Sequence, residues 1–247
     1  MTIESETEST DRLEPAASKQ RPAESVIKRV RWAEAVLALA LILDAGLAAL
    51  ARHYAYFEWD LNLERWIQSI HAFGFDVLMR AVSLLGDGWR PFGLVMAAGV
   101  LLFLVKLRLE GLTLLTGLGL GAVLNSVIKG IVGRPRPSRF LVQVSAGDHL
   151  ESFPSGHVVF FVEFFGFIFF LSYVLIGRGP VRTGVIALCV AAVSIIGVSR
   201  VYLGAHWPSD VAGAYLSGGI WLFLMIEVYR RLKTRRYGER EKRPGAA

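Results

Sequence analysis

Two basic residues, Lys129 and Arg136, lie in a stretch that reads Lys-Gly-Ile-Val-Gly-Arg-Pro-Arg-Pro over residues 129–137. Its glycines and prolines interrupt a helix, so the chain can fold back and bring both side chains to one point. A phosphate group matches this pair, because a guanidinium binds two oxygens at once and an ammonium adds a compact charge. The alternative is that both side chains extend to lipid headgroups at a membrane surface.

A second cluster, Pro-Ser-Gly-His at residues 154–157, directly precedes a long apolar run. Ser155 is a suitable N-cap for the helix that follows. The first turn of that helix presents unpaired N–H groups and the positive end of a dipole, a geometry that binds anions. His157 lies where it can give a proton to a leaving oxygen. The alternative is an ordinary capping or interfacial histidine.

A third cluster joins Ser199-Arg200 to His206 and Asp210. Pro208 fits the first turn of a helix. Asp210 can then hold one ring nitrogen of His206 and leave the other free to attack, which is the arrangement of a nucleophile and its orienting group in covalent catalysis. The alternative is a structural pair of histidine and aspartate that caps the helix.

The elements that carry these clusters are predicted to be membrane helices. Six apolar runs follow one another, at about 32–51, 91–106, 111–128, 157–176, 183–201 and 211–229. Two of them are short for the ~20 residues that a span requires. Buried helices of a soluble bundle are the alternative, but residues 158–176 lack the polar face that such a helix shows. We therefore predict an all-α polytopic membrane helix bundle with six transmembrane spans.

The composition agrees with a membrane protein. Of the 247 residues, 53% are hydrophobic and 19% are charged, and the mean hydropathy is +0.46. A soluble domain has ~45–50% apolar and ~25% charged residues. These values exclude disorder as the main state, and the single cysteine, Cys189, excludes an intramolecular disulfide and any metal site built on cysteines.

Lysine and arginine predict the orientation. They gather before the first run, between the second and third, between the fourth and fifth, and after the last. With six spans these four groups lie on one side, which must be the cytoplasm, together with both termini. The net charge of +6 is therefore a topology signal, and we predict no nucleic-acid partner. A role of the basic tail in binding lipid headgroups or nucleic acid is the weaker alternative. All three clusters then lie on the opposite, extracytoplasmic face.

Three domain-level predictions follow from the remaining segments. Residues 1–27 are predicted to be a disordered cytoplasmic tail, 28–232 the six-span domain and 233–247 a basic cytoplasmic tail. The long outer segment 52–90 is predicted to contain a helix in the plane of the interface, or else a helix that caps the bundle. That helix is indicated by apolar residues at helical spacing: Trp59, Leu63, Trp66, Ile67 and Ile70. Glu163, close to two turns below His157, is a candidate for lining the substrate cavity or regulating entry.

Taken together, the three clusters resemble the tripartite signature of the type 2 phosphatidic acid phosphatase superfamily, over about residues 91–228. That group comprises integral membrane lipid phosphate phosphatases and the soluble vanadium haloperoxidases. The resemblance implies that His206 forms a phosphohistidine, that Asp210 orients it and that His157 is the general acid. It also implies that phosphoryl oxygens are held by five residues: Lys129, Arg136, Ser155, Gly156 through its amide, and Arg200. Neither a metal nor another cofactor is implied.

We therefore expect a phosphatase at the outer face of the plasma (inner) membrane whose partners are membrane lipids and a lipid phosphate substrate. Undecaprenyl pyrophosphate, phosphatidylglycerol phosphate and phosphatidic acid are all compatible, and the oligomeric state is not predicted. A phosphotransferase that uses the same phosphohistidine, and a non-catalytic lipid-binding protein, are the alternatives. Three fixed cations can stabilise a phosphoryl transition state without magnesium. A haloperoxidase is disfavoured by the apolar runs, since it would be soluble.

Overall fold

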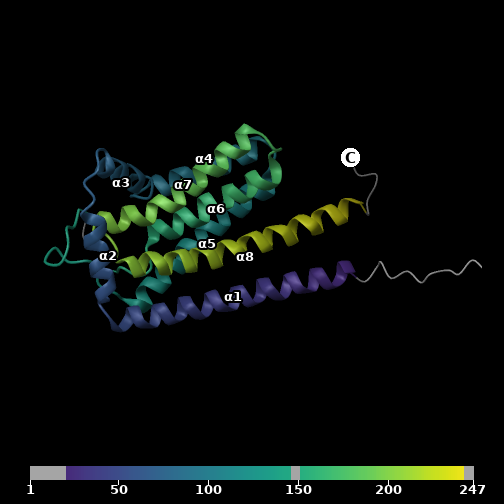
Figure 1. Cartoon of the computed structure of the whole chain (residues 1–247). Coiled ribbons are helices and arrows are strands. Elements are labelled where there is room, and N and C mark those ends of the chain that lie inside the picture. The colour runs from purple at the N-terminus through teal and green to yellow at the C-terminus, as the bar shows by residue number, and fades with distance from the viewer. Residues whose placement is uncertain (1–20, 146–150, 242–247) are drawn as a thin grey trace, which may run out of the picture. The chain divides into compact units, whose positions relative to one another are not determined.

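A computed structural model describes residues 21–145 and 151–241, and the side chains of 31–145 and 151–236. This part of the chain is helical and contains no strand, which confirms the all-α prediction (Figure 1). The eight helices are α1 (Arg21–His53), α2 (Glu58–Gln68), α3 (Phe75–Leu84), α4 (Arg90–Leu104), α5 (Arg108–Val132), α6 (Gly156–Leu175), α7 (Pro180–Tyr202) and α8 (Pro208–Glu241).

The chain divides into two units between Leu39 and Ala40, and α1 runs through this boundary. The predicted tail 1–27 lies mostly outside the described residues, and so does the end of the predicted tail 233–247. All of the predicted site residues lie in the second unit, which is the subject of the following paragraphs.

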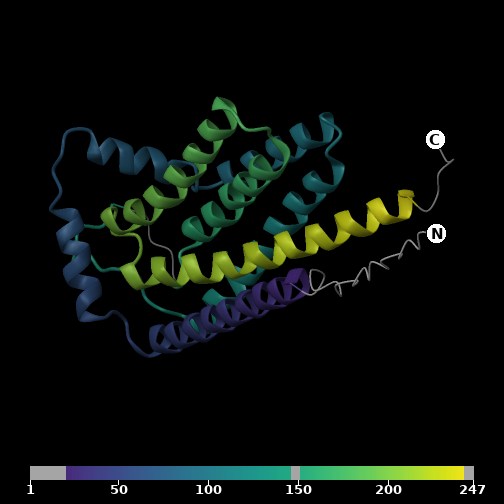
Figure 2. The same ribbon diagram turned by 45° about the vertical axis from the view of Figure 1, so that its right-hand side comes forward.

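Helix α6 is the centre of this unit, in contact with α5, α7 and α8 (Figures 1 and 2). Apolar residues lie on all sides of it, apart from a few polar residues such as the buried Glu163, as is typical of a helix that neighbours surround. Two hydrophobic clusters follow one another along it. The first joins its N-terminal half to α7 and α8 around Val158, Phe161 and Ile196. The second joins its C-terminal half to α5 and α8 around Phe167 and Leu114. Together they hold rigidly the helix that begins at the candidate site.

Five helices are long and apolar enough to cross a membrane: Arg31–His53 of α1, then α5, α6, α7 and Pro208–Arg236 of α8. The sixth predicted run corresponds to α4, which has 15 residues. At ~1.5 Å per residue it extends about 22 Å, less than the ~30 Å of a hydrocarbon core. Length alone therefore supports five spans, and a sixth would require local thinning of the bilayer around α4.

The segment 52–90 forms two helices, α2 and α3, where the sequence predicted one. Helix α2 lies across the end of the bundle where α8 begins and contacts α7 and α8 (Figures 1 and 2). Its buried face is largely polar and includes Asp60, Glu64 and Gln68, whereas its exposed face carries Trp59, Leu63 and Trp66. Of the predicted apolar residues only Ile67 is buried in α2, and Ile70 lies beyond its end. Polar side chains thus attach this helix to the bundle.

Two glycines shape the loops that form the site. Gly133 ends α5 with a left-handed φ of 61°, and its N–H donates to the Lys129 carbonyl at 2.8 Å. Gly204 has a φ of 64°, and a Cβ there would collide with the Gln143 carbonyl oxygen. The loop after α5 and the loop after α7 can therefore approach each other closely, at the end of the bundle where α6 begins.

Candidate active site

The imidazole of His206 lies in the loop between α7 and α8 and is 1% exposed. Its Nδ1 is 3.7 Å from Asp210 Oδ2 and 3.4 Å from Ser152 Oγ. The Ser152 hydroxyl donates to the same Asp210 oxygen, and the Trp207 N–H donates to it at 3.0 Å. With Nδ1 facing these acceptors, the neutral ring favours a proton on Nδ1, which leaves the Nε2 lone pair for a substrate.

The electrostatic surroundings keep His206 neutral. Burial lowers the pKa of its imidazole well below the ordinary value, and the positive charges of Arg136, Arg200 and Lys129 lower this pKa further. A neutral imidazole is a nucleophile, whereas an imidazolium is not. All three predicted cations thus lie close enough to His206 to act on it, so the structure brings together clusters that the sequence places up to 77 residues apart, from Lys129 to His206.

The predicted cations retain hydrogen-bonding capacity after their contacts with the protein. Lys129 Nζ and Arg136 Nη1 donate to backbone carbonyl oxygens at 3.0 and 2.9 Å, and Arg200 Nη1 donates to the Ser83 hydroxyl. The Nε atoms of Arg136 and Arg200 are buried and have no hydrogen-bond partner among the described residues. A buried donor without a partner costs about 1–3 kcal/mol. Phosphoryl oxygens are acceptors that can remove this cost.

Helix α6 begins at the same place. Ser155 occupies its N-cap position as predicted, but the hydroxyl makes no capping bond and, within the described chain, is buried without a partner. The Ser155 N–H donates to the Asp210 carbonyl at 3.3 Å. A Cβ at Gly156 would lie 3.4 Å from Asn125 Nδ2 and 3.9 Å from Lys129 Cε. The Lys129 side chain therefore lies beside the positive end of the helix, and both favour an anion there.

His157 pairs with a residue that the sequence did not single out. Its Nε2 lies 2.8 Å from Asp87 Oδ1, in the connection between α3 and α4. The ring also lies against Gly86, where a Cβ would come within 2.9 Å of the His157 Cγ and Nε2 atoms. The side chain of His157 is 17% exposed and that of Asp87 43% exposed. Burial of the ring and the charge of Arg200 disfavour a protonated imidazole, and the Asp87 carboxylate opposes both effects. A general acid needs the protonated form, so Asp87 favours that role of His157.

The two arginines of the first cluster have different surroundings. Arg134 is 1% exposed and forms ion pairs with Asp60 at 3.0 Å and Asp210 at 2.6 Å. It also donates to the Ser209 hydroxyl at 2.7 Å. Arg136 is the arginine whose charge acts on His206, and burial lowers the pKa of its guanidinium without discharging it at neutral pH. The charge of Arg136 therefore acts on His206, whereas Arg134 is paired with the buried carboxylates of Asp60 and Asp210.

Comparison with known proteins decides the family. The sequence model of the PAP2 superfamily matches residues 110–233, which is half of the chain. The chain belongs to the PAP2 superfamily. This confirms the resemblance that the three clusters indicated, since the matched residues contain all eight predicted site residues.

Individual PAP2 relatives are phosphatases. The chain is 30% identical over 160 residues to phosphatidylglycerophosphatase B of Bacillus subtilis (strain 168), covering 61% of this chain and 72% of that protein. It is 26% identical over 144 residues to undecaprenyl-diphosphatase of Sulfolobus acidocaldarius, covering 56% of this chain and 65% of that one. The prediction that this PAP2 protein is a phosphatase is thereby confirmed.

The fold also matches a solved PAP2 structure. The crystal structure of a transmembrane PAP2 type phosphatidylglycerolphosphate phosphatase from Bacillus subtilis superimposes with a TM-score of 0.69 at 24% identity. The match covers 79% of this chain and 96% of that one. With five helices able to span a bilayer, it supports the prediction of an integral membrane protein.

The sequence missed three groups of this PAP2 site. Asp87 contacts His157, Ser83 contacts Arg200, and Ser152 contacts His206. None of them lies in one of the three clusters. The only sequence signal was the Gly-Asp-Gly turn at 86–88 within the long segment 52–90, and a turn of this kind is common in loops.

Proposed function

We propose that this PAP2 protein hydrolyses a lipid-linked phosphomonoester or pyrophosphate through a phosphohistidine on His206. Undecaprenyl pyrophosphate, phosphatidylglycerol phosphate and phosphatidic acid are the candidate substrates. The names of the two curated relatives, a phosphatidylglycerophosphatase and an undecaprenyl-diphosphatase, favour the first two. The residues around the phosphate carry no information about the lipid tail.

The reaction has two steps. In the first, the Nε2 lone pair of His206 attacks phosphorus, the bond from phosphorus to the leaving oxygen breaks, and His157 gives that oxygen a proton. Asp210 stabilises the positive charge that develops on the ring through Nδ1. In the second, neutral His157 takes a proton from water, the hydroxide oxygen attacks phosphorus, and the P–N bond breaks to release phosphate and neutral His206. The three cations, Ser155 and the Gly156 amide hold the equatorial oxygens in both steps.

One observation carries this proposal: a neutral, oriented imidazole lies among three cations whose buried donors are partly unpaired. Arg136 Nε, Arg200 Nε and Ser155 Oγ are buried without hydrogen-bond partners in the described part of the chain. A purely structural cluster would satisfy these groups within the protein. A tetrahedral or trigonal phosphoryl group with several acceptor oxygens satisfies them and neutralises the charge.

We also propose the membrane arrangement. Helix α4 crosses as a sixth, shorter span, the site faces the extracytoplasmic side, and both termini are cytoplasmic. The exposed apolar face of α2, with Trp59 at 48% and Trp66 at 65% exposure, then lies in the interface beside the site.

Cysteine labelling tests which side of the membrane each loop faces, in a Cys189→Ser background that removes the native cysteine. A cysteine at Arg139 should react with an impermeant maleimide on intact cells, and one at Arg178 only after permeabilisation. The reverse pattern contradicts the orientation.

The activity is tested by phosphate release from purified full-length protein in detergent, with excess chelator, on the three candidate lipids. His206→Ala should abolish release and His157→Ala should reduce it by about 10²–10⁴-fold, the usual contribution of a general acid. His71→Ala, an exposed histidine beyond α2, is the matched control and should leave release unchanged.

A phosphoprotein that forms rapidly, is labile in acid and stable in alkali, and is absent from His206→Ala would identify the phosphohistidine intermediate. Release that requires magnesium, or that survives loss of His206, refutes the mechanism. Rapid multiple-turnover release of phosphate without an added alcohol acceptor supports hydrolysis, because a strict phosphotransferase needs such an acceptor to turn over.

A further inference from the structure

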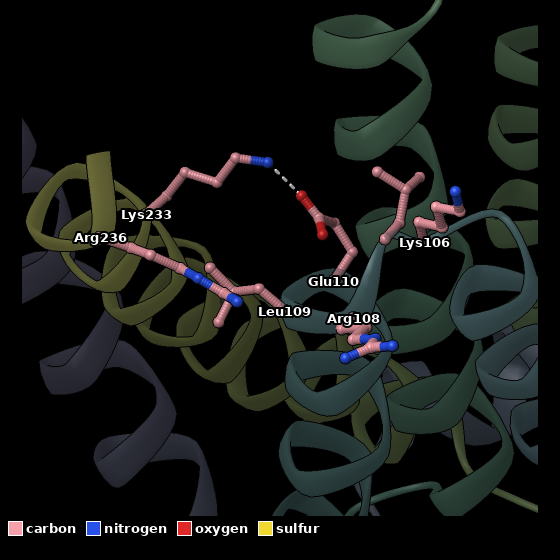
Figure 3. A pocket seen from close by; sticks show the side chains of 7 residues that line it. Lys106, Arg108, Leu109, Glu110, Lys233 and Arg236 are labelled. Carbon is pink, nitrogen blue, oxygen red and sulfur yellow. Dashed lines mark hydrogen bonds and ion pairs between the residues drawn. The ribbon is translucent and has the colours of Figure 1, made fainter. Parts of the chain in front are cut away.

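A cationic cavity lies at the other end of α5 from the proposed active site. Its volume is about 170 Å³, and it is lined by the turn between α4 and α5, the first turn of α5 and the turn of α8 that carries Lys233 and Arg236 (Figure 3). Four basic side chains and one carboxylate line it: Lys106, Arg108, Lys233, Arg236 and Glu110. With all of them ionised, the lining carries a net charge of +3.

The floor of this cavity is built from buried groups. Glu110 is 2% exposed, and its Oε1 accepts a hydrogen bond from the Tyr229 hydroxyl at 2.9 Å. Lys233 of α8 forms an ion pair with the same oxygen (Figure 3). This connection fixes α8 against the start of α5, so the cavity has a defined shape. It also compensates the one negative charge on the floor, so that the cavity does not repel an anion.

The other cations of the cavity are not neutralised. Lys106, Arg108 and Arg236 are exposed, and among the residues whose side chains are described none of them forms a salt bridge. By contrast, the neighbouring Arg230 and Arg231 both pair with Glu227 on their own helix. The first turn of α5 also lines the cavity and has no side-chain cap, so the positive end of its dipole adds to the three free cations.

The position of the cavity identifies its surroundings. Arg108 begins α5 and Lys129 lies near its end, so a rise of ~1.5 Å per residue separates them by about 30 Å. This is the thickness of the hydrocarbon core, ~30 Å. When Lys129 contacts a phosphate at one membrane surface, Arg108 therefore lies at the headgroup level of the opposite leaflet. A phosphate group is the anion that is abundant there.

The chemistry of the lining also favours phosphate. A volume of about 170 Å³ is the room of five or six waters, at ~30 Å³ each, which admits a phosphate group with part of its hydration. Two guanidinium groups supply paired N–H donors, and the lysine adds a point charge. The cavity opens to the protein surface between exposed side chains, so a phosphate group can bind inside it while the acyl chains of the same lipid stay outside.

We propose that this cavity binds the phosphate group of an anionic lipid in the leaflet opposite the active site. The bound lipid is not a substrate, because no nucleophile of the active site is within reach; it holds the start of α5 and the end of α8 together from the membrane. This proposal concerns binding, and it stands or falls independently of the phosphatase reaction.

Native mass spectrometry of the full-length protein in detergent tests it, with phosphatidylglycerol and phosphatidylcholine as probes. The pocket variant is Arg108→Gln/Arg236→Gln. The matched control is Arg230→Gln/Arg231→Gln, which removes the same charge from the same end of the bundle. We expect the pocket variant to bind phosphatidylglycerol about 25-fold more weakly than wild type, since each basic side chain near a membrane surface contributes about fivefold. Phosphatidylcholine binding should not change, and the control should resemble wild type.

Equal weakening in both double variants would mean a general charge effect and would overturn the site, as would no weakening in the pocket variant. A second arm adds inorganic phosphate. If it displaces phosphatidylglycerol from wild type at millimolar concentration, the ligand is soluble phosphate and the lipid assignment is wrong. Lipid bound at the active site is common to all three proteins and cancels in the comparison. Unchanged phosphate release by the pocket variant would show that it is folded.

Discussion

Asp87 should contribute to catalysis through His157, and Asp87→Asn isolates that contribution. The substitution keeps the shape of the side chain but removes its charge, 2.8 Å from the His157 Nε2. Hydrogen bonds to charged groups contribute about 1.5–3 kcal/mol. Because the Asp87 side chain is 43% exposed and therefore screened by solvent, we take the lower limit. About 1.5 kcal/mol corresponds to a loss of roughly tenfold in kcat/KM.

Two substrates distinguish acid catalysis from a structural effect. A lipid phosphomonoester has an alkoxide leaving group that needs a proton, whereas p-nitrophenolate leaves without one. Asp87→Asn should therefore slow the lipid substrate about tenfold and p-nitrophenyl phosphate much less, mainly through kcat. Asp76→Asn is the matched control, since Asp76 is similarly exposed at 51% and pairs with Arg80 on α3. It should leave both rates unchanged.

The result that would refute this reasoning is an equal loss on both substrates. The aspartate would then position the loop between α3 and α4 rather than the proton. A second check uses the His157→Ala background, in which Asp87→Asn should add no further loss on the lipid substrate, because contacting residues that act as a unit are not additive. A full additional tenfold loss in that background would equally contradict the assignment.

Burial, with the charges of Asp60 and Asp210, raises the pKa of Glu64 to about 9, so the folded protein holds a proton that the unfolded chain releases above pH 5. The free energy of unfolding should therefore fall by up to about 4 kcal/mol from pH 5 to pH 8, and in Glu64→Gln the thermal unfolding midpoint should depend much less on pH over that range. Arg134→Met leaves buried carboxylates unpaired and should destabilise by about 3–5 kcal/mol in the same assay, whereas Arg136→Met should keep the midpoint and lose phosphate release. Gly86→Ala should displace the imidazole ring beside it and slow phosphate release by up to about 100-fold, with little change in midpoint because a mobile side chain can yield.

The helix ends that carry two of the three clusters could be predicted from sequence because each signal is local. A Pro-Ser-Gly-His turn before an apolar run predicts a helix N-terminus from neighbouring residues alone, and α6 begins at Gly156. Pro208 likewise marks the start of α8, which places Asp210 one turn after His206. The different surroundings of Arg134 and Arg136 could not be predicted, since both are arginines followed by proline. They depend on partners of Arg134 that are distant in sequence, Asp60 at 74 residues before it and Asp210 at 76 residues after it.

The sequence by itself determined that the chain is a helical membrane protein, because the length and apolarity of a span are properties of consecutive residues. It also indicated which chemical groups could form a phosphate site. Tertiary structure alone decided which side of α2 faces the bundle, because the polar face found partners on α8 and the loops while the apolar face was left exposed. Tertiary structure also decided the partners of the proposed catalytic groups. Asp87 meets His157 across 70 residues and Ser83 meets Arg200 across 117, and no periodicity along the chain encodes contacts of that separation.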